Sequence, residues 1–162
     1  MDTNPIAQNV TKLYPVATPE DERSLLSTMR SAAWLVPNSE MSQFLSPTLA
    51  AQLPAAKRAA EAMLRPATVE DFRRYLAPCL VLTAPSGMSQ ADQRNWLIAA
   101  GGALDGLPAD LLKFGTDRAT READHPSKIV PAILKAVDAI WRGRRDDLAK
   151  INRMIAASEQ VA

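Results

Sequence analysis

The feature of this sequence that most constrains its fold is an apolar repeat near the C-terminus, in which the intervals alternate between three and four residues. This spacing places side chains on one face of an α-helix, because a helix completes a turn about every 3.6 residues. The repeat extends over about three heptads and predicts one long amphipathic helix, with Pro131 in its first turn. The repeat positions are Leu134, Val137, Trp141, Arg144, Leu148, Ile151 and Ile155, and the arginine is the one interruption.

Helix-starting signals divide the rest of the chain. A hydroxyl side chain followed by proline, or by an acidic residue within one turn, is typical of a helix N-terminus, where free backbone N–H groups need acceptors. The twelve prolines also favour several separately started helices over a few continuous ones. Starts of the hydroxyl type occur at Thr18, Ser46, Thr68 and Ser89, and a start with proline first occurs at Pro108.

Three internal positions affect the expected helices. Pro54 predicts a kink, or two short helices, within residues 47–64. The pair Gly101 and Gly102 predicts either a close helix contact or an early helix end, since each glycine costs about 1 kcal/mol relative to alanine. The apolar stretch around Cys79 has the length of a buried strand. No second strand is available to pair with it, so a helix is favoured.

Composition sets the fold class. The chain has 162 residues, 47% of them hydrophobic and only six of them glycine, so it can bury a core of its own. Abundant alanine and the near absence of β-branched runs favour helix over strand. We predict an all-α, single-domain bundle of about five to six helices within residues 18–162, with a long C-terminal helix. Residues 1–17 have no sustained periodicity and are expected to form a flexible or extended arm.

The net charge, the cysteine count and the length of the apolar runs disfavour several classes of protein. A formal net charge of +1 gives no global attraction to nucleic acid or to a membrane surface. Cys79 is the single cysteine and is expected to be a buried structural thiol, so an intramolecular disulfide and a cysteine-based metal site are excluded. No apolar run approaches the ~18 residues of a membrane span. We expect a cytoplasmic protein that needs no cofactor or metal.

His125, the only histidine, is the first candidate for chemistry. Its neighbours Asp124 and Ser127 could orient the ring for acid–base work, or the ring could cap the turn before Pro126. The capping role is favoured, because no second histidine and no carboxylate cluster at metal-ligand spacing accompanies it. The Ser86-Gly87 turn and the glycine-rich residues 101–106 lack the flanking residues of a nucleophile elbow or a phosphate loop. A non-enzymatic protein is predicted.

Arginines gather around Trp141 on the predicted final helix. Arginine beside an aromatic side chain can hold a phosphate backbone and stack on a base. Two aspartates follow at once, so a solvated charged face is the preferred interpretation. The alternatives are contact with an acidic protein partner and contact with nucleic acid. The residues that would contact nucleic acid are Lys128, Arg142 and Arg145.

The two halves of the apolar repeat are expected to have different roles. Residues 134–141 are expected to close the core, whereas residues 148–155 are expected to reach a protein partner or a second copy of the chain. The residues predicted to bind a partner are Trp141, Arg142, Arg144, Arg145, Leu148, Ile151 and Ile155.

The order of elements resembles a known arrangement. A tryptophan-bearing helix over 96–104 is followed by a Leu-Pro start at Leu107, a short alanine-containing helix to Ala123, a basic loop over 125–131 and the final helix. Across about residues 76–145 this is similar to the helical domain of small phage and prophage proteins that load or inhibit replicative helicases. The resemblance implies a phage protein without chemistry of its own, which binds and modulates a larger partner such as a replicative helicase. The alternative is a DNA-binding accessory protein that uses the basic cluster of the final helix.

Overall fold

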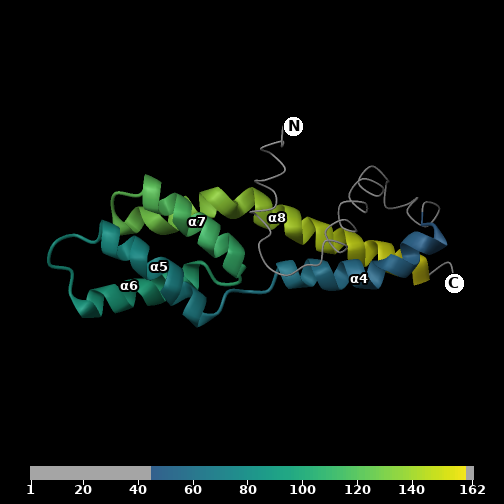
Figure 1. Ribbon diagram of the computed structural model, residues 1–162, viewed down its shortest axis with the longest axis horizontal. Helices are drawn as coiled ribbons and strands as arrows, with labels where there is room; N and C mark the ends of the chain where they lie inside the picture. The colour runs from purple at the N-terminus through teal and green to yellow at the C-terminus, as the bar shows by residue number, and fades with distance from the viewer. Residues whose placement is uncertain (1–44, 160–162) are drawn as a thin grey trace, which may run out of the picture. The chain divides into compact units, whose positions relative to one another are not determined.

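The computed structural model describes residues 45–159, and α-helices account for most of them. No strand is present in this range, where the only β-pairing is an isolated bridge between Pro66 and Pro108. The predicted all-α fold with a long C-terminal helix is therefore confirmed. The expected arm over residues 1–17 and the helix expected from Thr18 lie outside the described residues. The helices are α4 (Pro47–Met63), α5 (Val69–Thr83), α6 (Gln90–Ala103), α7 (Ala109–Glu122) and α8 (Pro126–Glu159), as Figure 1 shows.

The described residues fall into two compact units. The first unit comprises Arg65–Trp141, and the second combines residues 45–64 with residues 142–159. Helix α8 contributes its first part to one unit and its second part to the other. The single domain predicted over residues 18–162 stays a prediction.

Helix starts follow the capping chemistry expected from the sequence. The hydroxyl oxygens of Ser46, Thr68 and Ser89 each accept a hydrogen bond from the backbone N–H three residues later, at N–O distances of 3.2, 3.2 and 3.1 Å. At Thr68 the pairing is reciprocal, because its backbone N–H donates to the Asp71 carboxylate at 2.9 Å. These three starts are confirmed, and each depends on residues within a single turn.

Pro54 and Pro131 both lie inside helices. Helix α4 continues through Pro54 as one helix rather than two. The proline is exposed, so water can satisfy the carbonyl oxygen that has lost its donor. Helix α8 begins at Pro126 and not near Pro131, which is also exposed and lies inside the helix. The predicted start at Pro131 was wrong because Pro126 occupies the first helical position, where its missing N–H costs nothing.

The core of the first unit is formed by α5, α7 and the first part of α8, with the end of α6 and the following turn. Gly115 lies at a close approach of α7 to α8, since a Cβ atom there would lie 2.6 Å from Cγ2 of Ile133. Gly101 and Gly102 have open space around them, so no helix contact explains them, and α6 ends at Ala103 directly afterwards. The fully buried apolar residues include Leu76, Leu104, Leu107, Leu111, Leu112, Ile129, Ile133 and Val137.

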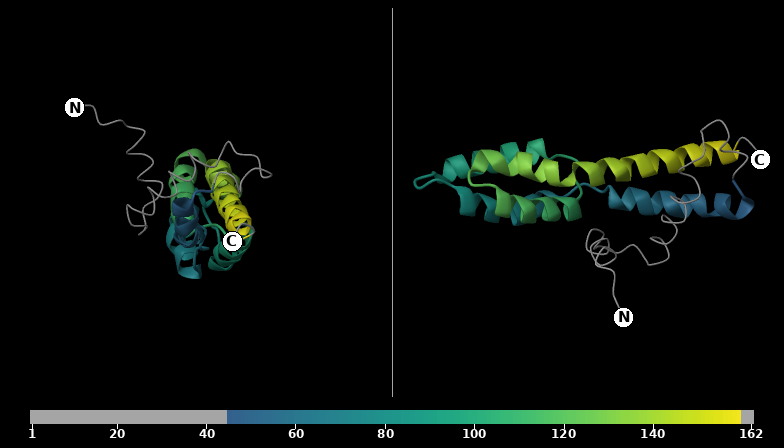
Figure 2. Two further views of the ribbon diagram at one scale, coloured as in Figure 1. Left: turned by 90° about the vertical axis from the view of Figure 1, so that its right-hand side faces the viewer. Right: turned by 90° about the horizontal axis from the view of Figure 1, so that it is seen from above.

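The second unit packs α4 against residues 142–159 of α8. Figures 1 and 2 both show these two helices running side by side. Three buried alanines of α4 give it a surface without bulk, which allows the larger side chains of α8 to approach closely. The buried cluster consists of Leu53, Ala56, Ala59, Ala60, Ile151 and Met154.

Candidate functional site

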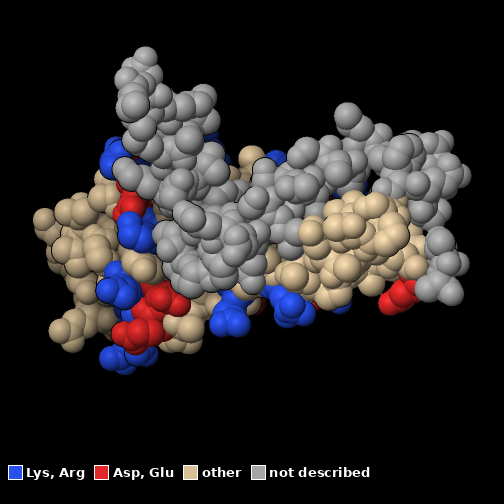
Figure 3. All heavy atoms as spheres, turned by 45° about the vertical axis from the view of Figure 1, so that its right-hand side comes forward, with Lys and Arg blue, Asp and Glu red and all other residues tan. Residues whose placement is uncertain are grey.

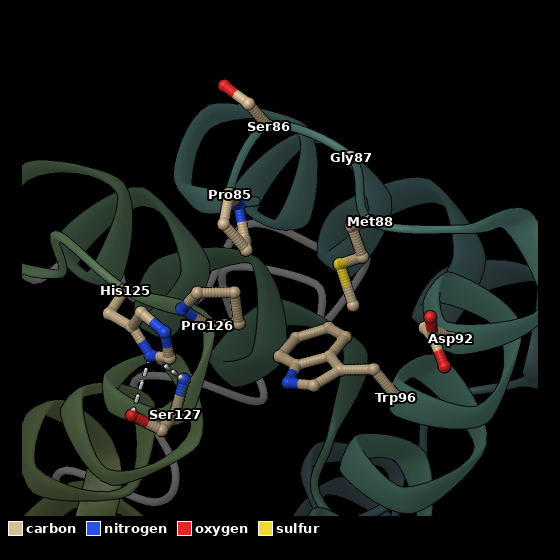
Figure 4. Close-up of a pocket in the computed structure, with 9 residues that line it drawn as sticks. All are labelled: Pro85, Ser86, Gly87, Met88, Asp92, Trp96, His125, Pro126 and Ser127. Carbon is tan, nitrogen blue, oxygen red and sulfur yellow. Dashed lines mark hydrogen bonds between the residues drawn. The ribbon is translucent and has the colours of Figure 1, made fainter.

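The turn between α5 and α6 and the start of α8 together form a pocket of about 470 Å³ in the first unit. The two segments are about thirty residues apart in the sequence and meet only in the folded chain. Most of the lining is apolar, and six of the nine residues are exposed to solvent. The lining residues, drawn in Figure 4, are Pro85, Ser86, Gly87, Met88, Asp92, Trp96, His125, Pro126 and Ser127.

One rim of the pocket is a tight turn. The backbone N–H of Met88 donates to the carbonyl oxygen of Pro85 at 3.2 Å. Gly87, the third residue of this turn, has a φ of +94°, a conformation that type II turns require and that side chains disfavour. The side-chain amide of Gln93 donates to the carbonyl oxygen of Met88 at 3.4 Å. The turn is therefore held to the first helical turn of α6.

The opposite rim is the capped start of α8. The backbone N–H of Ser127 donates to Nδ1 of His125 at 3.2 Å, and the Ser127 hydroxyl lies 2.9 Å from the same nitrogen. A neutral ring that accepts at Nδ1 carries its proton on Nε2. Beside this cap, Lys128 pairs with Asp124 at 2.7 Å, and its hydrogen bond lowers the pKa of that carboxyl. The interpretation of His125 as a capping residue is confirmed.

The middle of the pocket is apolar. Figure 4 shows the Trp96 indole, the Met88 side chain and the Pro126 ring turned toward one another, whereas Ser86 points away. Trp96 is half-buried, and its inner side packs against the core of the first unit. Trp96 and Met88 therefore offer apolar surface to an incoming group while being supported from behind.

Asp92 is the one carboxylate side chain among the lining residues. It accepts a hydrogen bond from the Ser89 hydroxyl at 2.7 Å. In the part of the chain that the structure describes, no lysine or arginine forms an ion pair with it. The pocket thus combines an indole face, a thioether, two proline rings and one carboxylate that has no ion-pair partner among the described residues.

The lining residues of the pocket do not form a catalytic triad. The Ser127 hydroxyl and the His125 ring are in contact, as a nucleophile and a base would be, but Nδ1 also accepts the backbone N–H. Asp92 lies on the far side of the pocket from His125 in Figure 4, and no hydrogen bond joins them. A triad needs a third group that orients the base, and the lining residues do not supply one. Binding is the chemistry that this arrangement supports.

The predicted partner-binding residues occupy very different environments. Arg144 is buried, and its Nη1 donates to the carbonyl oxygen of Met63 at 2.8 Å. Ile151 is also buried, and Leu148 and Ile155 pack half-buried against the same α4 cluster. This corrects the interpretation of residues 148–155 as a surface for a partner or a second copy: α4 of the same chain covers that half of the repeat, because its alanines admit the larger side chains.

The remaining candidates are divided between the units. Trp141 is half-buried against the core of the first unit, which agrees with a role in closing that core. Arg142 and Arg145 are exposed on α8 in the second unit. Lys128 belongs to the first unit, where it is paired with Asp124. The structure therefore does not bring the three predicted nucleic-acid-binding residues together in one unit.

Cys79 is buried, as expected. Its Sγ lies 3.3 Å from the Thr120 hydroxyl, and burial raises the pKa of the thiol. Within residues 45–159 no three potential metal-ligating side chains gather, and no helix there is apolar over a length that could cross a bilayer.

Comparison with known proteins gives no relative from which a role could be transferred. No family model, curated protein or solved structure matches the chain. The pocket itself was missed from the sequence, although Trp96, the Pro85–Gly87 turn and the His125 cap were each recognised separately. Nothing in the local spacing indicates that these segments meet.

Proposed function

We propose that this chain is a non-enzymatic interaction protein that holds a segment of a larger partner protein in the pocket of the first unit. The observation that carries the proposal is the partly exposed indole of Trp96, lying with Met88 and Pro126 in a depression that the described chain leaves open. Exposed aromatic and thioether surface in a concave site is typical of binding surfaces.

Preformed rims support binding to a partner. The turn over Pro85–Met88 is closed by its own hydrogen bond, and the start of α8 is capped by His125. A site whose walls are already ordered loses little conformational entropy when a ligand arrives. The open mouth, with Ser86, Gly87 and His125 exposed, suits a side chain presented by another protein better than a small molecule that must be enclosed.

The partner class comes from the resemblance noted in the sequence. Phage and prophage proteins of the helicase-loader type bind a replicative helicase, and a helicase of the host or the phage is the partner we propose. With such a partner, the role that we propose is in DNA replication, and the location is the cytoplasm. It requires a binding surface and no catalytic residues.

Site-specific photocrosslinking tests the proposal. A photoreactive amino acid replaces Met88 in the pocket or, as control, Lys113, which is exposed on α7 and outside the pocket. We expect an adduct with one replicative helicase from position 88 and none from position 113. Equal adducts from both positions, or none from either, would contradict the proposal.

Binding of the purified helicase then gives a quantitative test. Trp96→Ala is expected to weaken binding by about tenfold or more, the size of effect that loss of a central aromatic contact produces. Ile98→Ala is the matched control on the same helix, because Ile98 is 69% exposed and does not line the pocket. Met88→Ala serves as a second pocket variant, since Trp96 also supports the core. Equal binding by all variants would overturn the pocket as the site.

Nucleic-acid binding is the second candidate function. The excess of basic over acidic residues in the second unit favours it. Its described residues include seven lysines and arginines against four aspartates and glutamates. Arg142, Arg145 and Arg153 lie on the exposed side of α8, and burial together with the charge of Arg153 lowers the pKa of Lys150. In contrast, the first unit has nine of each sign, and basic and acidic side chains lie next to one another on the face shown in Figure 3.

Fluorescence anisotropy with labelled single- and double-stranded DNA tests this candidate. If it is correct, binding at about 50 mM salt weakens steeply as salt rises, and Arg142→Glu with Arg145→Glu abolishes it. Lys128→Glu has a smaller effect, since this residue belongs to the other unit and is paired with Asp124. Absence of binding at about 50 mM salt rules the candidate out.

A further inference from the structure

We infer that the pocket of the first unit recognises an arginine side chain of the partner protein. The inference deepens the proposed function and rests on it. It names the group that enters the pocket and the two residues that select it, Trp96 and Asp92.

The apolar middle of the pocket fits the stem of a long cationic side chain. Arginine buries its methylene groups along apolar surface while its guanidinium stays near water. The Met88 side chain and the rings of Pro85 and Pro126 provide such surface around the Trp96 indole, as Figure 4 shows. An open mouth is an advantage for this ligand, because the charged end does not have to be fully desolvated.

The indole face selects for positive charge. Tryptophan is the best aromatic partner for a cation, and a planar guanidinium stacks on it as well as being attracted to it. The described chain already contains contacts of this kind at other sites, since the guanidinium carbons of Arg74 and Arg118 lie 5.9 Å from the ring centroids of Tyr75 and Phe114. No such contact with a described arginine or lysine occurs at Trp96.

Asp92 adds charge complementarity. It supplies the one carboxylate that lines the pocket, and this group lies on the Trp96 side in Figure 4. The nearby lysine at the α8 start, Lys128, is neutralised by Asp124 at 2.7 Å. The His125 ring accepts a backbone N–H at Nδ1, so this nitrogen is occupied by the cap of α8. The carboxylate of Asp92 thus places a negative group in the pocket lining, which disfavours an acidic partner side chain.

The experiment uses the full-length chain and small probes that separate charge from shape. Nα-acetyl-arginine amide is titrated into ¹⁵N-labelled protein, and the indole N–H resonance of Trp96, assigned with Trp96→Phe, is followed. The citrulline analogue has the same shape without the charge, and the norleucine analogue supplies only an apolar chain. We expect arginine to bind about threefold to tenfold more tightly than citrulline, the range of one exposed cation–π contact with one exposed ion pair.

Variants assign the preference to the named residues. Asp92→Asn is expected to lower the affinity for the arginine probe to near that for the citrulline probe. Raising the salt concentration from about 20 mM to about 500 mM should also lower the affinity for the arginine probe. Asp105→Asn removes an exposed carboxylate of the same unit that does not line the pocket, and it leaves the affinity unchanged. The inference is overturned if the arginine and citrulline analogues bind equally tightly. It is also overturned if Asp92→Asn and Asp105→Asn lower the arginine affinity by the same factor.

Failure of this inference and failure of the proposed function give different results. If norleucine binds as tightly as arginine, the pocket is an apolar docking site and the helicase test with Trp96→Ala still decides the function. If none of the probes shifts the Trp96 resonance, arginine recognition is excluded, whereas crosslinking from position 88 remains an independent readout.

Discussion

The Nη1 atom of Arg144 lies 2.8 Å from the carbonyl oxygen of Met63, so a buried arginine of α8 caps the C-terminal turn of α4. The last carbonyl groups of a helix have no partner within the helix, and a charged donor satisfies one of them while favouring the negative end of the helix dipole. The residue that appears in the sequence as a break in an apolar repeat is thus a structural element of the second unit.

Replacing Arg144 by alanine should destabilise the second unit by about 2–4 kcal/mol, because a buried hydrogen bond to a charged donor and the packing of the side chain are lost together. Hydrogen exchange followed by mass spectrometry should show faster exchange in α4, with little change in α5. Arg145→Ala is the matched control, since Arg145 is exposed. Similar exchange in the two variants would contradict the capping role.

Replacing two helical glycines by alanine is expected to change the free energy of unfolding in opposite directions. Gly115→Ala should lower the free energy of unfolding by about 1–3 kcal/mol, because the new Cβ would lie 2.6 Å from Cγ2 and 3.3 Å from Cα of Ile133. Gly143→Ala should raise it by about 0.5–1 kcal/mol, because a Cβ there meets nothing within 4 Å. Urea unfolding followed by circular dichroism measures both, and a loss of stability for Gly143→Ala would be inconsistent with this geometry.

The capping box of α5 predicts a pH dependence. Hydrogen bonds from the Thr68 backbone and hydroxyl lower the pKa of Asp71 below its usual value of 3.8. The stabilisation is therefore fully present above the unfolded pKa and is lost as the pH falls through the lower folded value. Asp71→Asn should cost about 0.5–1 kcal/mol at neutral pH, and the difference from wild type should shrink below about pH 4. If the stability difference between wild type and Asp71→Asn stays constant down to about pH 2, the capping hydrogen bonds of the Asp71 carboxylate are not its cause.

The thiol of Cys79 should react slowly in the folded protein. Burial raises its pKa, so the reactive thiolate is scarcer than in the unfolded chain, and reagents have little access. We expect modification by a disulfide reagent at about pH 8 to be at least about tenfold slower without urea than in urea. Rapid stoichiometric reaction of the folded chain would show that the α5–α7 contact around Cys79 opens readily.

Three features could be predicted from the sequence because each depends on local information. They are the helix starts, the all-α class and the burial of Cys79. The hydroxyl of Thr68 and the carboxylate of Asp71 are three residues apart, and a single helical turn brings them together. The same locality made His125 recognisable as a cap. Apolar spacing likewise predicted a long final helix without reference to what covers it.

Tertiary structure alone decided which surfaces remain open. The repeat over residues 148–155 was indistinguishable from a partner-binding stripe until α4 was seen to cover it, because periodicity shows that one face is apolar and not which element buries it. Arg144 was assigned to the surface on charge alone, whereas the free carbonyl of Met63 gives a buried guanidinium its acceptor. The pocket around Trp96 exists because the Pro85–Met88 turn meets the start of α8, a contact that depends on packing between residues far apart in the chain. Local chemistry determined the helices of this protein, and long-range packing determined the site.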